Sequence, residues 1–494
     1  MPSNGAQHAY LAFDLGAESG RAVVGRLNHG MLSIDEIHRF LNEPVRCGNS
    51  LHWDVPRLWL EIRKGLNSAG HHKLEGIGVD TWGVDFALLG ENGELLQNPY
   101  HYRDERTTGM MKQVFDIVPA DEIYEQTGIQ FMPINTLYQL FASHRTTPRL
   151  LAAADRLITI PDLFHYWLTG NAVCEFTNAT TTQMVDPRTR TWAKGMLERL
   201  GLPSSLPAPI VEPGAVIGNL LPGVGVKEHS GTPVIAPASH DTGSAVVSIA
   251  ARENSAFISS GTWSLLGMEI DRPVINAEAR RLNFTNEGGV CGTTRLLKNV
   301  MGLWMLQSCR HCWSANGQQH EYQDLMKAAA REPGFRHLVN PDDPSFLKPE
   351  DMQAAIDQFC RKTDQPAPNG PGAYARTILE SLALKYRLVL RDLEYLTGNY
   401  VEQIRIIGGG SRNELLNQFT ADATGRQVVA GPVEATALGN IGIQMLATGA
   451  ASSLNEVRQI IDRSFPTVSF EPSNPSYWDE QAKRFQQYCE FTYA

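Results

Sequence analysis

The chain has 494 residues and a formal net charge of −10, and 42% of its residues are hydrophobic and 19% charged. One hydrophobic core rarely serves more than about 300 residues, so this length predicts two domains. The composition is typical of a folded protein and excludes a disordered one. The negative charge argues against nucleic acid or an anionic membrane as a partner.

The sequence carries no recognisable targeting signal. Its first ten residues, MPSNGAQHAY, lack the basic and apolar regions of a signal peptide. No apolar run approaches the roughly 18 residues that a membrane span needs. The seven cysteines do not resemble a disulfide framework, and the pair Cys309 and Cys312 lacks the further ligands of a zinc site. We therefore expect a cytoplasmic protein without a membrane partner.

Two short stretches in different halves of the chain share one pattern. Residues 11–26 (LAFDLGAESGRAVVGR) predict a strand, a glycine-bearing turn and a second strand, and residues 257–268 (FISSGTWSLLGM) repeat this scheme. Such a turn can direct backbone N–H groups at a polyphosphate, and the hydroxyls of Ser19, Ser260 and Thr262 would add donors. One such hairpin in each half of the chain predicts an enzyme that holds ATP between two lobes. It also indicates that the two halves arose by duplication of one topology.

Further elements follow from the periodicity of apolar residues. Residues 32–40 predict a third strand, residues 53–66 a helix capped by Asp54, and residues 76–89 a strand, a turn and a strand. Residues 134–168 predict mainly helix.

The second half predicts alternating helices and strands. The expected elements are a helix that ends at Gly398, a strand over 403–407, a helix over 413–424, a strand over 427–430 and a helix over 434–448. This order predicts an α/β fold with a largely parallel sheet covered by helices. We place the boundary near residues 243–256, which gives domains 1–245 and 246–494.

The first hairpin contains a candidate metal site. Asp14 comes directly before the turn, where a carboxylate could hold Mg²⁺ while the backbone of residues 17–21 binds phosphate. An ordinary hairpin with a turn-favouring aspartate is the alternative. Arg21 could neutralise phosphate or begin the next strand with its charge in solvent.

Asp241 is the candidate general base. It stands in PASHDTGSA (residues 237–245), where a strand is expected to end and a helix to begin. A carboxylate at a helix N-terminus stays ionised and can accept a proton from a hydroxyl group. The alternative is an N-cap aspartate. We expect the adjacent His240 to contact substrate or to pack in the core, because neighbouring residues rarely point to one centre.

Two more clusters bear on the ligand. Polar residues at 80–85 (DTWGVD) interrupt an apolar segment, and sugar hydroxyls could satisfy them, with Trp82 stacked on the sugar or placed in the core. The triple glycine at 408–410 would let an adenosine approach the backbone. The chain has no GxGxxG and no GxxxxGK[ST] motif, which removes dinucleotide-binding and P-loop folds.

The chain resembles the FGGY carbohydrate kinases of the actin-like ATPase superfamily over nearly its whole length. The stretches that carry the resemblance are DLGAESGR (14–21), DTWGVDFALL (80–89), GIQFMPINTLYQL (128–140), TNATTTQ (177–183), SHDTGSA (239–245), SSGTWSL (259–265), TNEGG (285–289), LKNVMGLWMLQ (297–307), GGGSRNELLNQ (408–418) and GPVEATALGNIGIQ (431–444). DTWGVDF and LKNVMGLW are most similar to the branch that acts on L-rhamnulose.

The resemblance implies two ribonuclease-H-like domains that flank a nucleotide and sugar cleft. Carried over residue by residue, the resemblance makes Asp241 the general base and Asp14 the support of the metal. The residues that would bind the nucleotide are Ala17, Glu18, Ser19, Gly20, Arg21, Thr262, Gln307 and Gly409. The residues that would bind the sugar are Gly83, His240, Asp241, Thr242 and Asn299. Glu18 departs from the small polar residue common at its position, and we expect its side chain to point to solvent.

The implied reaction is transfer of the γ-phosphate of ATP, with Mg²⁺, to the 1-hydroxyl of L-rhamnulose. A kinase for another ketose or polyol, such as L-fuculose or D-xylulose, and an actin-like ATPase without a sugar substrate are the alternatives. The polar cluster at 80–85 and Asp241 favour the kinase over the ATPase. The expected partners are a sugar and ATP alone, and the expected state is a monomer or small homo-oligomer.

Overall fold

The computed structural model describes residues 8–70, 72–249 and 254–490. The chain forms two compact units that alternate along the sequence. Unit 1 comprises residues 1–251, 269–296 and 435–465, and unit 2 comprises residues 252–268, 297–434 and 466–494. Residues 250–253, within the expected boundary region, lie outside the described residues, and the division between residues 245 and 246 stays a prediction.

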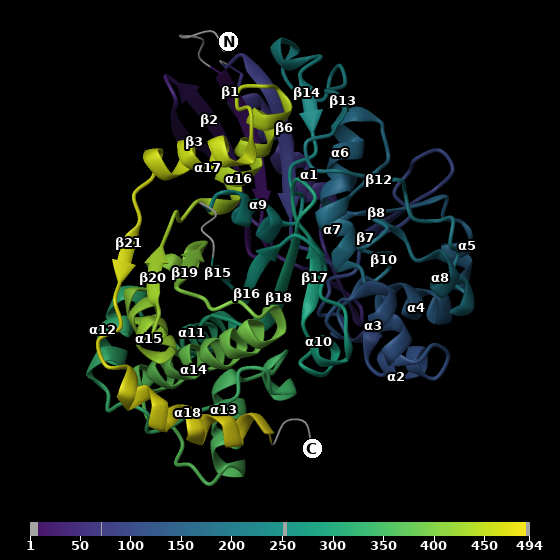
Figure 1. The fold of residues 1–494 in the computed structure, drawn as a ribbon. Helices are drawn as coiled ribbons and strands as arrows, with labels where there is room; N and C mark the ends of the chain where they lie inside the picture. The colour runs from purple at the N-terminus through teal and green to yellow at the C-terminus, as the bar shows by residue number, and fades with distance from the viewer. Residues whose placement is uncertain (1–7, 71, 250–253, 491–494) are drawn as a thin grey trace. The chain divides into compact units, whose positions relative to one another are not determined.

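Unit 1 is built on a six-stranded mixed sheet (Figure 1). The strands, in their order across the sheet, are β13 (Val216–Asn219), β14 (Pro233–Ile235), β6 (Leu74–Thr81), β1 (His8–Leu15), β2 (Ser19–Asn28) and β3 (Met31–Leu41). β1 and β2 form the expected hairpin, β3 is the expected third strand, and β6 runs parallel to β1. The glycine turn therefore lies at the end of a central strand of the sheet.

A different helix covers each face of this sheet. Helix α1 (Val55–Ser68) lies on one face and α16 (Ala435–Ala447) on the other. Gly65 of α1 approaches Phe13 and Ala22 so closely that a Cβ there would overlap them. Tyr10 belongs to the core cluster that contains α16. Successive side chains of a strand point to opposite faces, which explains this division.

Unit 1 contains many shorter elements. Its other helices are α2 (Met110–Phe115), α3 (Ala120–Thr127), α4 (Thr136–Thr146), α5 (Pro148–Ala152), α6 (Ile160–Thr169), α7 (Phe176–Thr181), α8 (Lys194–Arg199), α9 (Asp241–Val247), α10 (Ala277–Arg281) and α17 (Leu454–Ser464). Its other strands are β4 (Val45–Cys47), β5 (Ser50–His52), β7 (Phe86–Leu89), β8 (Arg156–Thr159), β9 (Cys174–Glu175), β10 (Val185–Asp186), β11 (Thr191–Trp192), β12 (Ile210–Val211) and β17 (Thr285–Gly288). The segment 134–168 is mainly helical, as predicted, but β8 interrupts it.

Unit 2 has a second mixed sheet. The strands of this seven-stranded sheet follow the order β17, β18 (Thr294–Met301), β16 (Trp263–Ile270), β15 (Ser255–Ser260), β19 (Gln403–Ile407), β20 (Gln427–Ala430) and β21 (Val468–Phe470). β15, β19 and β20 pair in parallel, whereas β16 and β21 pair antiparallel to their neighbours. The expectation of a largely parallel sheet was therefore wrong, because the hairpin and the returning strand β21 add antiparallel pairs.

The helices of unit 2 confirm the capping signals. They are α11 (Trp304–Ala315), α12 (Tyr322–Arg331), α13 (Met352–Lys362), α14 (Pro371–Thr397), α15 (Glu414–Thr424) and α18 (Pro475–Glu490). α14 ends at Gly398 and α15 at Gly425, and both glycines are left-handed. Asn413 caps α15 by accepting a hydrogen bond from the Leu416 N–H. In unit 1, Asp54 caps α1 in the same way.

The two sheets repeat one topology, as the paired hairpins predict. In unit 1 the hairpin β1–β2 is followed by β6 and β14, both parallel to β1, and by the antiparallel edge strand β13. In unit 2 the hairpin β15–β16 is followed by β19 and β20, and by the antiparallel edge strand β21. The same position of each sheet therefore carries a glycine turn.

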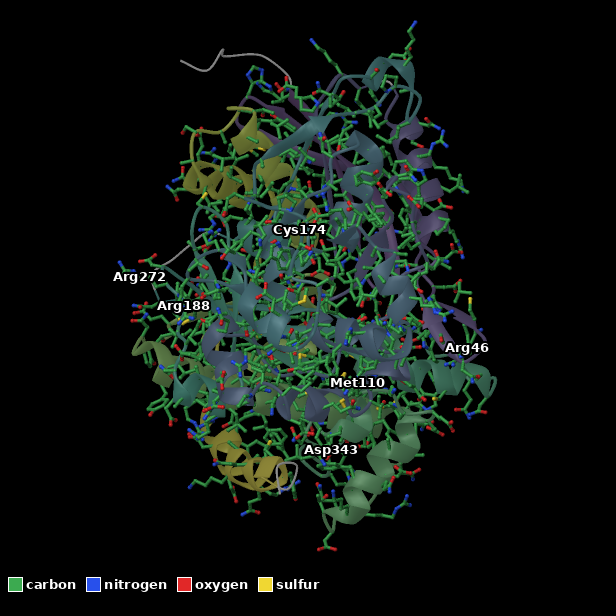
Figure 2. The ribbon with its side chains drawn as sticks, turned by 90° about the vertical axis from the view of Figure 1, so that its right-hand side faces the viewer. Arg46, Met110, Cys174, Arg188, Arg272 and Asp343 are labelled. Carbon is green, nitrogen blue, oxygen red and sulfur yellow. The ribbon has the colours of Figure 1, made fainter. Side chains whose placement is uncertain are left out.

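The side chains sort by polarity between surface and interior. Arg46, Arg188 and Arg272 lie at the surface, whereas Cys174 is buried (Figure 2). All seven cysteines carry free thiols. Among the described helices, none combines the length and the apolar character that crossing a membrane would require.

Candidate active site

The turn of the first hairpin is short and fixed by Asn42. Leu15 pairs with Gly20, and the Gly16 N–H donates to the Ser19 carbonyl at 2.9 Å. Asn42 donates from its side chain to the Gly16 carbonyl at 2.8 Å and from its backbone to the Glu18 carbonyl at 2.9 Å. Glu18 is exposed, as expected of its side chain.

Asp14 and Arg21 form an ion pair at the base of this turn. They are opposite each other in the β1–β2 register, and Arg21 donates from Nε and Nη2 to Asp14 Oδ2 at 3.0 and 2.6 Å. Both side chains are mostly buried, so Arg21 does not begin its strand with its charge in solvent. Asp14 therefore has a cationic partner that the sequence analysis did not assign to it.

Asp80 lies beside Asp14 on the neighbouring strand. The two residues are partners in the parallel β1–β6 register, and Asp80 is completely buried. Asn440 of α16 donates to Asp80 Oδ2 at 2.6 Å, whereas Asp80 Oδ1 accepts no hydrogen bond from any described residue. Burial, followed by the charge of Asp14, raises the pKa of Asp80 well above its usual range.

Asp241 is the first residue of α9. His240 occupies the N-cap position, so the alternative of an N-cap aspartate was wrong. Asp241 Oδ1 accepts hydrogen bonds from the Thr242 N–H at 2.5 Å and the Thr242 hydroxyl at 3.1 Å, and His240 Nε2 lies 3.5 Å away. No described residue donates to Asp241 Oδ2. One carboxylate oxygen is thus anchored and the other is available to a ligand.

The electrostatic surroundings of Asp241 favour a base. Burial raises the pKa of Asp241 above its usual range, Asp14 adds to the rise, and His240 opposes it. A carboxylate with a raised pKa accepts a proton more readily than an ordinary aspartate. Asp241 therefore has the environment of a general base.

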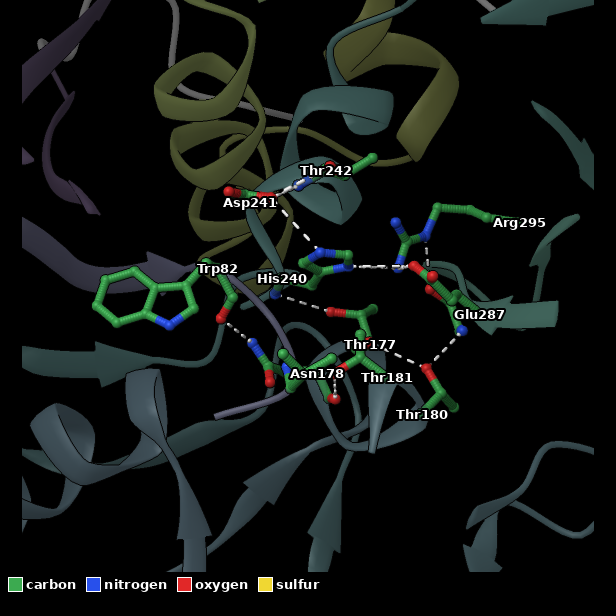
Figure 3. Close-up of polar contacts among 12 residues, drawn as sticks. Trp82, Thr177, Asn178, Thr180, Thr181, His240, Asp241, Thr242, Glu287 and Arg295 are labelled. Atoms are coloured by element: carbon green, nitrogen blue, oxygen red, sulfur yellow. Dashed lines mark hydrogen bonds and ion pairs between the residues drawn. The ribbon is translucent and has the colours of Figure 1, made fainter. Parts of the chain in front are cut away.

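The imidazole of His240 connects Asp241 to a buried ion pair. His240 Nδ1 lies 3.2 Å from Glu287 Oε2 and 3.2 Å from Arg295 Nη2 (Figure 3). Arg295 Nη2 is 3.3 Å from the same oxygen of Glu287. We call His240, Asp241, Glu287 and Arg295 the His240 cluster. His240 is buried, in agreement with the expectation that it packs in the core, and its Nε2 also lies 3.5 Å from Asp241 Oδ1.

Glu175 holds the segment that leads to Asp241. It is completely buried, and its Oε2 accepts from the Ser239 N–H at 2.9 Å and from the Ser239 hydroxyl at 2.8 Å. Its Oε1 accepts from the Thr177 N–H, and the Thr177 hydroxyl accepts from the His240 N–H at 3.2 Å. Burial raises the pKa of Glu175 to about 7.

The rest of α7 binds two further loops of unit 1. Asn178 donates to the Trp82 carbonyl at 3.2 Å, and the Thr181 hydroxyl accepts from the Val84 N–H at 2.9 Å (Figure 3). The Thr180 hydroxyl accepts from the Gly288 N–H at 2.8 Å, next to Glu287. Helix α7 therefore fixes the Trp82–Gly83 turn, the segment before α9 and the end of β17 relative to one another.

Asp85 organises the aromatic residues near Gly83. Its Oδ2 accepts from the indole N–H groups of Trp53 at 2.6 Å and Trp82 at 2.9 Å, and its Oδ1 accepts from Gln139 at 2.8 Å. Trp82 is buried with its ring centroid 4.0 Å from that of Trp53, so its place is in the core. Burial raises the pKa of Asp85 to about 6. Protein partners, not only a sugar, satisfy the polar residues at 80–85.

Three segments of unit 2 meet at the second glycine turn. The Gly261 carbonyl accepts from the Leu303 N–H at 2.9 Å, and the Thr262 carbonyl accepts from the Trp304 N–H at 3.2 Å, at the start of α11. Gln307 lies on the first turn of this helix. Thr262 and Gln307, two of the expected nucleotide residues, are therefore held close together.

The triple glycine completes this arrangement. Gly408 has a positive φ of 80°, which favours glycine, and a Cβ on Gly410 would overlap the side chain of Ser260. A Cβ on Gly409 would meet no atom within 4 Å, and this residue is exposed. Gly408 and Gly410 thus pack the loop against the hairpin, and Gly409 faces open space that a nucleotide could use.

Most of the chain aligns with one family of enzymes. Residues 9–248 match the N-terminal domain, and residues 256–448 the C-terminal domain, of the FGGY family of carbohydrate kinases. The chain belongs to this family. The expected resemblance is confirmed.

Relatives of this FGGY kinase chain carry a more specific name. A protein named rhamnulokinase from Bacteroides thetaiotaomicron is 46% identical over 95% of this chain and 97% of its own length. A second rhamnulokinase, from Oceanobacillus iheyensis, is 42% identical over 94% of this chain and 98% of its own.

Solved structures confirm the fold of the kinase chain. The gluconate kinase of Lactobacillus acidophilus superimposes with a TM-score of 0.80 at 18% identity, over 98% of this chain and 98% of its own. The xylulose kinase of the same organism superimposes with a TM-score of 0.79 at 18% identity, over 98% of this chain and 97% of its own. The two-domain sugar-kinase fold agrees with the expectation.

The acidic residues of the kinase chain fit a metal ion. FGGY kinases use ATP, which in phosphoryl transfer is commonly bound with Mg²⁺. The buried, unpartnered Oδ1 of Asp80 beside Asp14 is an oxygen of the type that Mg²⁺ prefers. Within the described ranges, no three acidic, histidine or cysteine residues group tightly enough to hold a metal by themselves. Phosphate oxygens and water would supply the remaining ligands.

Several positions in this kinase chain were not assigned a role from the sequence. They are Glu175 and Thr177 beside α9, Asn440 beside Asp80, and Glu287 and Arg295 beside His240. A signal for Thr177 was present in TNATTTQ (177–183), a run of mostly polar residues that are all buried and must therefore find partners. The roles expected for Asn299, Gly20 and the other site residues stay predictions.

Proposed function

We propose that this chain is an ATP-dependent kinase that phosphorylates L-rhamnulose at its 1-hydroxyl. The observation that carries the proposal is identity of 42–46% with rhamnulokinases over nearly the whole of both chains. The open Oδ2 of Asp241, at the start of α9 and near Gly83 through the contacts of α7, supports it. A sugar-independent ATPase would not need such a base.

Asp241 takes the proton in the proposed reaction. Its Oδ2 accepts the proton of the 1-hydroxyl while that oxygen attacks the γ-phosphorus of ATP, and the bond from this phosphorus to the bridging oxygen of ADP breaks. The products are ADP, sugar 1-phosphate and a protonated Asp241, which returns its proton to solvent. The transition state depends mainly on positioning and on charge stabilisation.

The nucleotide residues divide between the two hairpins. Residues 17–21 of the first turn would donate backbone N–H groups to phosphate oxygens, and Thr262, Gln307 and Gly409 would serve the nucleotide from unit 2. Mg²⁺, when bound, would neutralise charge on the phosphates, and Asp14 and Asp80 are the residues that would hold it. The proposal also places the enzyme in the cytoplasm as a monomer or small homo-oligomer.

A substrate panel tests the proposal. Purified protein is assayed for ADP release with Mg²⁺·ATP and L-rhamnulose, L-fuculose, D-xylulose, L-ribulose, glycerol or no sugar. We expect a clear preference for L-rhamnulose, with the phosphate at its 1-position by NMR. Preference for another sugar would overturn the substrate, and ATP hydrolysis that ignores every sugar would overturn the kinase.

The D241N variant tests the assigned base in the same assay. Loss of a general base lowers turnover by about 10²–10⁴-fold, and we expect a fall in this range. ATP binding, measured by calorimetry, should stay near the wild-type value because Asp241 does not serve the nucleotide. Near-normal turnover would remove the assignment.

A further inference from the structure

The ion pair behind His240 is held rigidly. Arg295 and Glu287 are 1% and 5% exposed, and Arg295 Nε donates to the Gly288 carbonyl at 2.8 Å. The Gly288 N–H in turn donates to Thr180 of α7. Because its Nε bond and the Glu287 carboxylate fix the guanidinium from two sides, Nη2 has one direction left, which leads to His240 Nδ1 (Figure 3).

The contact between Arg295 and His240 determines where the imidazole carries its proton. A guanidinium donates hydrogen bonds and accepts none, so Arg295 Nη2 can bond to Nδ1 only when Nδ1 carries no proton. The neutral ring then carries its proton on Nε2, which is the nitrogen that faces Asp241 Oδ1 at 3.5 Å. The opposite tautomer would direct a lone pair at the Asp241 carboxylate and an N–H at the ion pair. Glu287 Oε2 also lies 3.2 Å from Nδ1 and could accept from such an N–H, but of these two contacts only that with Arg295 has the geometry of a hydrogen bond.

The tautomer of His240 affects which carboxylate oxygen of Asp241 can accept the substrate proton. Oδ1 already accepts from the Thr242 N–H and hydroxyl, and an Nε2–H group adds a third donor on the same side. Contacts of this kind are commonly long in ligand-free enzymes and shorten in the substrate complex. Three donors on Oδ1 leave Oδ2 to the substrate.

We propose that Glu287 and Arg295 are positioning residues of this kinase: Arg295, held by Glu287, fixes His240 as the Nε2–H tautomer, and His240 orients Asp241 so that Oδ2 accepts the substrate proton. The proposal rests on the proposed function of Asp241 as the base. It gives a role to TNEGG and to Arg295, which the nucleotide and sugar assignments leave without one.

The tautomer can be observed without any variant of the ion pair. Full-length protein with ¹⁵N-labelled histidine is examined by long-range ¹H–¹⁵N NMR at pH 8, and H240Q assigns the resonances of His240. We expect a pyrrole-like Nε2 and a pyridine-like Nδ1. A proton on Nδ1, in the neutral or the charged ring, would overturn the proposal whether or not the sugar substrate is correct.

Kinetics test whether the ion pair acts through Asp241. We expect R295M to lower kcat by about 10-fold, the value of one well-placed hydrogen bond, with KM for ATP unchanged. R376M is the matched control, because Arg376 forms a buried pair with Glu380 in unit 2 at 2.7 Å and lies in neither hairpin. Its kcat should equal that of the wild type.

The double variant separates positioning from general stability. In the D241N background, R295M should cause no further loss of the residual turnover, measured with radiolabelled ATP, because the base it orients is gone. A further loss by the same factor, or an R376M defect equal to that of R295M, would overturn the proposal. A wild-type protein that phosphorylates no sugar would instead remove the proposed function, and the NMR result would still decide the tautomer.

Discussion

At the scale of single residues, Asp241 is placed at a cost to stability. Burial and the charge of Asp14 raise its pKa, which means that the folded protein disfavours the ionised form relative to the unfolded chain. When the pH is below the ordinary aspartate pKa, the carboxyl is protonated in both the folded and the unfolded state, and the cost is absent. When the pH is above the raised pKa of the folded state, the full cost applies. An enzyme that needs an ionised base must work in the range where this cost applies.

The D241N variant should therefore be more stable than the wild type at neutral pH. The amide oxygen can still accept from Thr242, while the buried charge is removed. We expect an increase of about 1 kcal/mol in the free energy of unfolding at pH 7.5, by urea denaturation. The difference should shrink as the pH falls from the raised pKa of Asp241 toward the ordinary aspartate pKa. A variant less stable than the wild type at pH 7.5 would contradict this account.

Asp85 offers a second prediction, for the sugar side. In D85N one oxygen can still accept from the two indoles, but an amide N–H₂ would then face the donor group of Gln139. The resulting shift of the Trp82–Gly83 turn should raise KM for the sugar by about 10-fold, with KM for ATP unchanged. D351N, at the exposed cap of α13, should alter neither. Equal effects on both KM values would disprove a local role.

At the scale of elements, the position of α9 depends on its contact with α16. The two helices touch at Gly439, where a Cβ would overlap the backbone carbonyl of Ser244. A backbone group on a helix cannot turn aside as a flexible side chain can, so relief would require α9 to move. Asp241, at the start of α9, would move with it.

The G439A variant should consequently lose both stability and turnover. Overpacking of this kind costs about 1–3 kcal/mol, and we expect a loss in this range by thermal and urea unfolding, together with a lowered kcat. G195A is the control, since a Cβ at Gly195 of α8 meets no atom within 4 Å. It should keep wild-type kcat and be slightly more stable. Unchanged kcat in folded G439A would show that α9 tolerates displacement.

The elements that the sequence predicts well are those with local signals. Asn413 and Gly425 bound α15, and Gly398 ends α14, because caps and left-handed glycines act within one turn of the helix. The glycine turns and the position of Asp241 at the start of a helix were predictable for the same reason. The strand β21 and its antiparallel pairing had no such signal, since its partner β20 lies some 40 residues earlier.

Only those site residues that stand in a recognisable sequence motif could be predicted. Asp14, Gly83 and Asp241 each stand in a recognisable stretch, but their partners come from remote segments. Asp241 meets Glu287 and Arg295 only through His240, and Asp80 meets Asn440 across 360 positions of sequence. Such contacts arise from tertiary packing, and a single sequence contains no periodicity that reports them.

At the scale of the whole molecule, unit 1 needs the end of the chain for its core. Leu438 and Ile441 of α16 and Val457 of α17 are completely buried in one cluster with Tyr10 and Val23. Burial of one such side chain contributes about 1.5–3 kcal/mol, so loss of both helices is comparable with the whole stability of a typical domain. The fold of unit 1 is therefore not a property of its first 249 residues alone.

A fragment of residues 1–249 tests this dependence. We expect it to show no cooperative thermal transition by circular dichroism and to be digested by protease far faster than the full chain. The fragment also lacks residues 269–296, which carry Glu287 and Arg295. A cooperative transition in the isolated fragment would show that the core closes without α16 and α17.

The late return of residues 435–465 to unit 1 has a consequence for biosynthesis. Domains commonly fold as their segments leave the ribosome, from the N-terminus onward. Here the strands that carry Asp14 and Asp80 emerge early, yet the helices that cover them are translated after most of unit 2. The nascent chain must keep an open sheet through much of its synthesis, and a product that terminates before residue 435 lacks α16 and α17 and cannot complete unit 1.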